Sequence, residues 1–259
     1  MILPLDPSPA SAGSLTPAQL DDFRRDGFLH MPGFIAPAEI EDLGRRLRSL
    51  FDRFYDLPAE HARDLDETPR KRGTPPRNPE ITRCGELDPA LAASPYVERV
   101  RAAAGRLLGG PAELGFDHAI YKPPAVGTGT AWHQDGAYDP SPGLFRRLSF
   151  WLPLQPVSAE QGCLQFLPGS HRAGLHPHHP VTGDATGHTL TLDVPADAEP
   201  AAVPMALGDL VVHHPYCTHC AGPNTTARPR LAWVLMFQTR HRQPPRSRFR
   251  RLAGKLIGN

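Results

Sequence analysis

The spacing of apolar residues follows a helical period in the first part of the chain and a strand-like period in the second. Over residues 37–54, apolar side chains recur every three or four positions, which predicts an amphipathic helix that packs against a sheet. Two further helices are predicted at residues 16–26 and 96–108. The first opens with helix-capping residues at positions 16–19, and glycine follows both helices.

Beyond these helices, short runs rich in apolar, aromatic and β-branched residues alternate with Gly, Pro and Asn. This pattern predicts strands. Helices followed by many short strands favour a mainly β fold of the α+β type, with a β-sandwich or jelly-roll core and N-terminal helices packed on the sheet. The predicted strands cover residues 116–122, 148–154, 163–167, 189–194, 210–214 and 231–239.

The same pattern divides the chain into a central domain and two ends. Residues 1–14 are rich in Pro and Ser and are expected to form a flexible arm. Residues 15–240 are expected to form a single domain. Within it, charges and prolines over residues 57–86 predict a long surface loop, of which the part near residues 81–83 could fold over a substrate. The arginine-rich residues 241–259 are expected to be a solvated basic tail.

Composition excludes several classes of partner. The 259 residues include 28 basic and 27 acidic side chains, a formal net charge of +1, so no global field attracts nucleic acid or a membrane. We therefore expect a small-molecule partner, and a monomer or small homo-oligomer. The 4 cysteines are too few for a disulfide framework. Because no secretory signal or bilayer-spanning run is visible, we expect a cytoplasmic protein.

The strongest chemical signal is the stretch Trp132-His133-Gln134-Asp135-Gly136, with a histidine-rich stretch from His213 to His219 further on. A histidine and an aspartate two positions apart in a strand point to the same face and can bind one ion. If the fold brings His219 beside them, two imidazoles and one carboxylate form one face of an octahedral iron(II) site. A lone histidine is more often a packing residue, and the chain has 13 of them.

A competing interpretation is a zinc site formed by Cys217, His219 and Cys220. A structural zinc site needs four ligands, and a single Cys-x-x-Cys pair supports one only weakly. These cysteines are better explained as small buried side chains in a loop. The segment Pro177-His178-His179-Pro180 is interpreted in the same way, as a solvated connection between strands rather than a metal site.

Several ordered motifs lie at residues 132–136, 160–171 and 208–210, at His219 with residues 222–224, and at residues 228–230. Together they resemble the phytanoyl-CoA dioxygenase family, whose members use iron(II), 2-oxoglutarate and dioxygen. The resemblance extends from about residue 15 to residue 239 and implies a double-stranded β-helix, also described as jelly-roll or cupin-like.

The resemblance assigns roles to individual residues. It implies that His133, Asp135 and His219 are the catalytic iron ligands. It also implies that Arg230 binds the distal carboxylate of 2-oxoglutarate as a bidentate partner, with Arg228 as the alternative.

Other positions are implied to bind or line the cosubstrate: His118, Lys122 and Trp151, the last of which could equally be a core aromatic. A hydroxyl residue common in the family is replaced by Ala221. Its hydrogen bond to the cosubstrate would then be missing or come from Thr225 or Thr226.

The function implied is oxidation of an unactivated C–H bond in a small organic molecule, expected to be a secondary metabolite, with release of succinate and carbon dioxide. The outcome is hydroxylation or a related cyclisation, epimerisation or desaturation. Asp135 disfavours halogenation, because halogenating relatives have a small residue there. Substrate-binding candidates, chosen by position alone, are Arg83, Phe116, Trp132 and Tyr138. The alternative from another class is a non-catalytic jelly-roll binding module with a vestigial metal site.

Overall fold

A computed structural model describes residues 15–67, 71–126, 128–139, 145–182 and 189–240. The expected arm at 1–14 and the expected tail at 241–259 lie outside the described residues. The described helices are α1 (Pro17–Asp26), α2 (Pro37–Asp52), α3 (Cys84–Leu87), α4 (Pro89–Ala92) and α5 (Pro95–Leu108), with short 3-10 turns η2 (Asp135–Tyr138) and η3 (Ser170–Ala173).

Strands β1 to β13 form two larger antiparallel sheets and one strand pair. The large sheet has the order β1-β11-β6-β13-β4-β3-β2, the small sheet has the order β10-β7-β12-β5, and β8 pairs with β9. The strands are β1 (Phe28–Met31), β2 (Ala62–Asp64), β3 (Pro79–Thr82), β4 (Glu113–Lys122), β5 (Thr130–His133), β6 (Phe145–Pro153), β7 (Leu164–Phe166), β8 (His179–Pro180), β9 (Leu190–Thr191), β10 (Ala201–Val203), β11 (Leu210–His213), β12 (His219–Ala221) and β13 (Arg230–Arg240).

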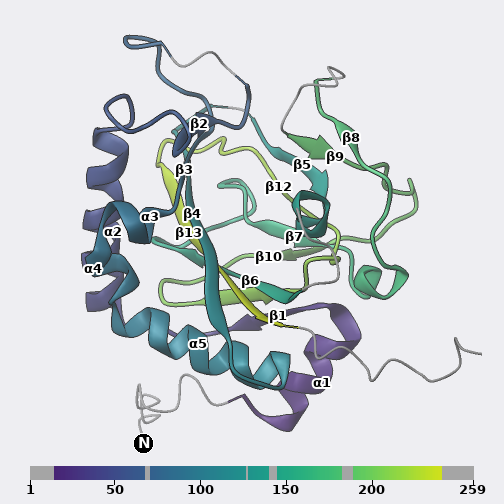
Figure 1. The fold of residues 1–259 in the computed structure, drawn as a ribbon. Coiled ribbons are helices and arrows are strands. Elements are labelled where there is room, and N and C mark those ends of the chain that lie inside the picture. Colours follow the sequence, from purple (N-terminus) through teal and green to yellow (C-terminus); the bar gives the residue numbers. More distant parts are fainter. Residues whose placement is uncertain (1–14, 68–70, 127, 140–144, 183–188, 241–259) are drawn as a thin grey trace, which may run out of the picture.

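The predicted helices are confirmed, together with the signals that end them. Thr16 and Gln19 form a reciprocal capping box at the start of α1. Gly27 and Gly109 adopt positive φ angles of 82° and 68° directly after α1 and α5, a conformation that favours glycine. The helices α1, α2 and α5 cover one side of the large sheet, whereas the small sheet lies on its other side (Figure 1).

Alternation along the central strands separates the hydrophobic core from the interior of the double-stranded β-helix. On β6, Leu148, Phe150 and Leu152 pack toward the helices, while Ser149 and Trp151 face the small sheet. Strands β11 and β13 alternate in the same way. One face of each strand therefore builds the core, and the other face is free to carry the polar groups of a site. This arrangement confirms the mainly β, jelly-roll expectation.

The prediction of a long loop over residues 57–86 is wrong for part of that segment, which contains two strands and a helix. Strands β2 and β3 extend the large sheet, with β3 paired to β4, and α3 follows at once. Two of the charged side chains there, Asp64 and Glu80, are buried rather than solvated. Asp64, which is 5 % exposed, accepts backbone hydrogen bonds from Asp66, Arg77 and Asn78. Buried charges paired in this way are invisible to a pattern that assigns charged residues to the surface.

No helix among the described residues is long and apolar enough to cross a bilayer.

Candidate active site and metal centre

Three side chains with metal-binding chemistry converge between the two sheets, at His133, Asp135 and His219. One ligand atom from each lies within 4.8 Å of the other two. Strand pairing explains the two histidines, because β5 and β12 are antiparallel neighbours in which His133 lies directly opposite His219. The sequence predicted that Asp135 lies in the same strand as His133. In the structure it lies in the turn η2, which follows that strand.

Hydrogen bonds orient each of the three groups. His133 Nδ1 bonds the carbonyl oxygen of Ala131 at 2.8 Å, and His219 Nδ1 bonds that of Cys217 at 2.9 Å, so each ring turns its Nε2 inward. Asp135 Oδ1 lies 3.6 Å from His133 Nε2 and 3.5 Å from His219 Nε2. The three atoms therefore surround one point, which suits a divalent ion held by two imidazoles and one carboxylate.

The second carboxylate oxygen of Asp135 is held by two residues that the sequence did not single out for this role. Ser149 Oγ donates to Oδ2 at 2.6 Å, and His213 Nε2 lies 2.9 Å from the same atom. His213 is 2 % exposed. These contacts leave Oδ1 free for an ion and fix the plane of the carboxylate. The only sign of this role in the sequence is that His213 is a further histidine in the stretch that carries His219. The fold is needed to show that its partner is Asp135.

Electrostatics favours the protonation states that metal ligands require. Burial would raise the pKa of Asp135, but its interactions with the imidazoles of His219 and His213 hold it well below its usual range. Burial and the neighbouring imidazoles His133 and His213 hold the pKa of His219 well below its usual range. An ionised carboxylate and a neutral imidazole are the forms that bind a cation.

A cavity opens beside these ligands and contains most of the predicted cosubstrate residues. Its lining includes His118, Trp151 and Arg230, and residues that the sequence did not suggest, among them Thr130 and His213. Thr130 lies on β5 directly opposite Ala221 on β12. The hydroxyl that Ala221 lacks is therefore present on the facing strand.

Arg230 is the residue in this cavity that most clearly needs a partner. It is 1 % exposed, and among the described residues its Nε and Nη1 have no hydrogen-bond partner. Burial lowers its pKa to about 10. The guanidinium carbon lies 5.4 Å from the ring centre of Trp151, so this tryptophan both belongs to the core between the sheets and covers the arginine. Unpaired donors on a buried cation fit the distal carboxylate of 2-oxoglutarate.

Other predicted cosubstrate residues lie outside the cavity lining. Lys122 pairs with Arg230 across β4 and β13 and donates to the carbonyl oxygens of Ala221 and Gly222 at 3.3 and 2.7 Å. Thr225 is exposed, and its hydroxyl donates to the carbonyl oxygen of Glu160. The hydroxyl of Thr226 bonds Asn224 and Arg228, so neither threonine hydroxyl is free in this structure, and the cosubstrate contact expected of one of them stays a prediction.

The substrate candidates surround the site without lining this cavity. The ring centre of Tyr138 lies 6.2 Å from that of His133, and its hydroxyl accepts from the backbone of Leu190. Arg83 lies over the ring of Phe116 at 5.9 Å, and that ring lies 5.5 Å from His118. Trp132 is on β5 beside the first ligand. Their roles remain predictions.

The zinc interpretation does not fit the geometry. Among the described residues, the group of side chains placed to hold a metal is the one around Asp135, without a cysteine. Cys217 and Cys220 are buried, with the thiol of Cys217 directed at the carbonyl oxygens of Asp26 and Leu167. Burial raises the pKa of both thiols to about 12, which opposes the thiolate that zinc requires.

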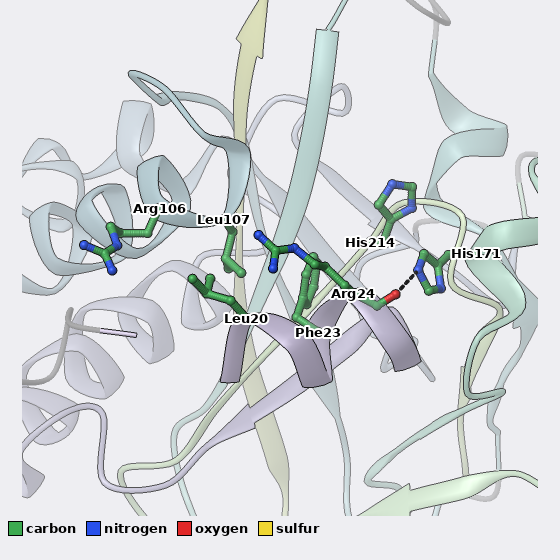
Figure 2. Close-up of a pocket in the computed structure, with 7 residues that line it drawn as sticks. All are labelled: Leu20, Phe23, Arg24, Arg106, Leu107, His171 and His214. Atoms are coloured by element: carbon green, nitrogen blue, oxygen red, sulfur yellow. Dashed lines mark hydrogen bonds between the residues drawn. The ribbon is translucent and has the colours of Figure 1, made fainter. Parts of the chain in front are cut away.

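A second hollow lies away from the metal-binding residues, between α1, α5 and the loop that carries His214 (Figure 2). His171 and His214 approach each other there, with ring centres 5.3 Å apart. The Nε2 atom of His171 lies 3.2 Å from the carbonyl oxygen of Arg24, so this ring joins η3 to α1. The hollow shares no lining residue with the active-site cavity.

Comparison with known proteins identifies the family. The model of the phytanoyl-CoA dioxygenase (PhyH) family matches residues 23–232. The chain belongs to this family. As a member it is an iron- and 2-oxoglutarate-dependent dioxygenase, consistent with the His-Asp-His cluster and the unpaired arginine in one cavity.

Relatives of known structure and sequence agree with the family assignment. Phytanoyl-CoA dioxygenase domain-containing protein 1 of Bos taurus is 27% identical, over 85% of this chain and 89% of that protein. EvdO2 of Micromonospora carbonacea var. aurantiaca, solved in complex with 2-oxoglutarate, is 32% identical with a TM-score of 0.72, covering 89% of this chain and 95% of that one. The epimerase SnoN, solved with Fe3+, alpha ketoglutarate and nogalamycin RO, is 25% identical with a TM-score of 0.62, covering 89% and 84%.

Proposed function

We propose that the chain oxidises an unactivated C–H bond of a small secondary metabolite, with His133, Asp135 and His219 as its iron ligands. The observation that carries this proposal is the presence in one cavity of the three converging ligand atoms and the buried, unpaired guanidinium of Arg230. Iron bound there would activate dioxygen, which is the oxidant, and 2-oxoglutarate would be oxidised to succinate and carbon dioxide together with the substrate C–H bond. The protein groups hold, orient and enclose the reactants.

The chain's own residues divide this work. His133 and His219 present neutral Nε2 atoms, while Ser149 and His213 turn one carboxylate oxygen of Asp135 toward the ion. Arg230 pairs with the distal carboxylate of 2-oxoglutarate. The low exposure of these groups keeps water from competing for the same contacts.

The class of substrate is supported by the relatives. The epimerase SnoN was solved in complex with Fe3+, alpha ketoglutarate and nogalamycin RO, which supports a small organic metabolite as the substrate of this chain. Hydroxylation, epimerisation, cyclisation and desaturation share the initial removal of a hydrogen atom, so the ligand set is compatible with each. Halogenation is disfavoured because the carboxylate of Asp135 is in place between the two histidines.

The proposal is tested by anaerobic addition of iron(II) and 2-oxoglutarate, which gives a visible charge-transfer band when both bind one site. A screen of candidate metabolites for substrate-dependent succinate release, with product structures, then identifies the reaction. Asp135→Ala should abolish succinate release while the circular dichroism spectrum stays that of the wild type. A non-catalytic binding module would give neither the band nor succinate, and that result would overturn the proposal.

A further inference from the structure

A buried carboxylate lies behind the active-site cavity, on a strand that the sequence had assigned to a loop. Glu80 on β3 is 3 % exposed, and both of its oxygens are occupied. Oε1 lies 2.5 Å from His118 Nδ1, and Oε2 accepts from Nε of Arg63. Strand pairing produces this order, because Arg63 on β2 lies opposite Glu80, and β3 pairs in turn with β4, which carries His118.

The carboxylate controls the charge of the histidine that it contacts. Burial would lower the pKa of His118, but the hydrogen bond and charge of Glu80, followed by the charges of Asp135 and Asp117, raise it. Burial would raise the pKa of Glu80, but His118 and Arg63 outweigh it and lower the value to about 2. The lowered pKa of Glu80 and the raised pKa of His118 both favour an ionised carboxylate beside an imidazolium.

The other nitrogen of the imidazolium faces the active site. His118 lines the cavity that also contains His133, Asp135 and Arg230. Within the described part of the chain no group accepts a hydrogen bond from its Nε2, whereas its Nδ1 is committed to Glu80. With Nδ1 fixed, the ring has one orientation, and a charged N–H donor is directed at the space beside the metal-binding atoms.

We propose that Glu80 is a positioning residue that holds His118 as a charged donor. The Nε2–H group of His118 then donates a hydrogen bond to a carboxylate oxygen bound next to the metal. The inference rests on the proposed iron and 2-oxoglutarate site. That carboxylate belongs either to 2-oxoglutarate or to the organic substrate. The shared chemistry is a charge-assisted N–H···O hydrogen bond, for which a carboxylate is the best acceptor among neutral and anionic oxygens.

A purely structural ion pair would not need this arrangement. An apolar pair of similar volume stabilises a sheet as well as a buried ion pair does, because desolvation offsets the attraction. Here the pair adds a third charge, Arg63, whose side chain is 45 % exposed and extends the array to the surface. A chain of charges from solvent to cavity suits the recognition of an anion and adds little to the packing of the sheet.

The first experiment is nuclear magnetic resonance of the zinc-loaded protein with 13C,15N-labelled histidine, in which His118→Gln identifies the signal. We expect imidazolium shifts for His118 in the wild type at pH 7.5 and a neutral ring in Glu80→Gln, which keeps the size and an acceptor oxygen. Glu86→Gln, on the neighbouring exposed helix, is the matched control and should leave the signal unchanged. A neutral His118 in the wild type would overturn the proposal without any variant.

The second experiment separates the two sources of carboxylate. If 2-oxoglutarate provides it, adding this acid moves the His118 signal, and Glu80→Gln weakens 2-oxoglutarate binding to the iron-loaded protein at least tenfold. If the substrate provides it, 2-oxoglutarate leaves the signal in place, and acetate added to the 2-oxoglutarate-saturated protein moves it. A signal that neither acid moves refutes the role of His118 as a carboxylate donor.

These results are separable from the proposed function. The charge state of His118 needs no iron and no turnover. A wild-type protein that shows the imidazolium but no charge-transfer band with iron and 2-oxoglutarate would refute the proposed function and leave the Glu80–His118 pair established.

Discussion

Replacing Arg230 with methionine should separate cosubstrate binding from stability, because no described residue accepts a hydrogen bond from two of the donors on this buried cation. Two of its donors, Nε and Nη1, are buried and unpaired in the described structure. Hydrogen bonds to charged groups contribute about 1.5–3 kcal/mol each, so the loss of two costs at least about 3 kcal/mol, or about a 150-fold rise in the Kd for 2-oxoglutarate.

The metal-free protein should respond in the opposite direction. Burial lowers the pKa of Arg230 to about 10, which shows that the desolvated charge is disfavoured where it lies. Methionine fills a similar volume without that charge. The variant loses the contact with Trp151, about 1 kcal/mol, but no longer buries an unpaired cation, which costs more. We therefore expect a free energy of unfolding equal to or above that of the wild type.

The assays are an anaerobic titration of the iron-loaded protein with 2-oxoglutarate, followed by the visible band, and urea unfolding of the protein in a chelator. Arg228→Met is the matched control, since Arg228 is exposed two positions away and should change neither result. Unchanged affinity in Arg230→Met would refute the reasoning. A loss of several kcal/mol in stability would instead make Arg230 a structural residue.

Three further predictions concern the surroundings of the site. His213→Phe keeps a ring but removes the hydrogen bond to Asp135, so iron(II) affinity in a competition titration should fall about 10- to 100-fold; equal affinity would show that Ser149 suffices. Burial lowers the pKa of Lys122 to about 6, far below that of a lysine in the unfolded chain. Between pH 6 and 8 the unfolded chain therefore binds one proton more than the folded protein, and the free energy of unfolding of the metal-free protein rises with pH. Lys122→Met should remove a slope of up to about 1.4 kcal/mol per pH unit from urea unfolding, and an unaltered slope would assign it elsewhere. In Gly162→Ala, at a φ of 74°, the new Cβ would lie 2.2 Å from the carbonyl oxygen of Gly222, and unfolding should show a loss of about 2 kcal/mol or more; a stable variant would mean that this turn relaxes freely.

Local signals in the sequence predicted the helices and most long strands, because capping residues and periodicity act within a few positions. The capping box at Thr16 and the stop at Gly27 are such cases. The ligand triplet was predictable as well, although Asp135 lies in a turn and not in the strand. Its i, i+2 spacing still places both side chains at one ion because the turn begins directly after β5.

What the sequence could not provide are contacts between distant strands. Glu80 belongs to a charged, proline-rich segment, which predicts a solvated side chain. Nothing in the neighbouring sequence indicates that His118 and Arg63 pair with its carboxylate and offset the cost of burying the charge. His213 was one histidine among 13, and only the pairing of β11 with β6 brings it to Asp135 beside Ser149. Partners of this kind depend on sheet order, which single-residue patterns do not encode.

The direct pairing of His133 with His219 also has a consequence for the life of the protein in a cell. Strand β5 is an edge strand of the small sheet, and β12 is its neighbour. An ion bound by residues of both strands would crosslink them, so metal binding and the pairing of this edge stabilise each other. Newly made chains that lack the metal should open this edge more often, and proteases and chaperones recognise unpaired strands. Metal supply would then set the abundance of the enzyme as well as its activity.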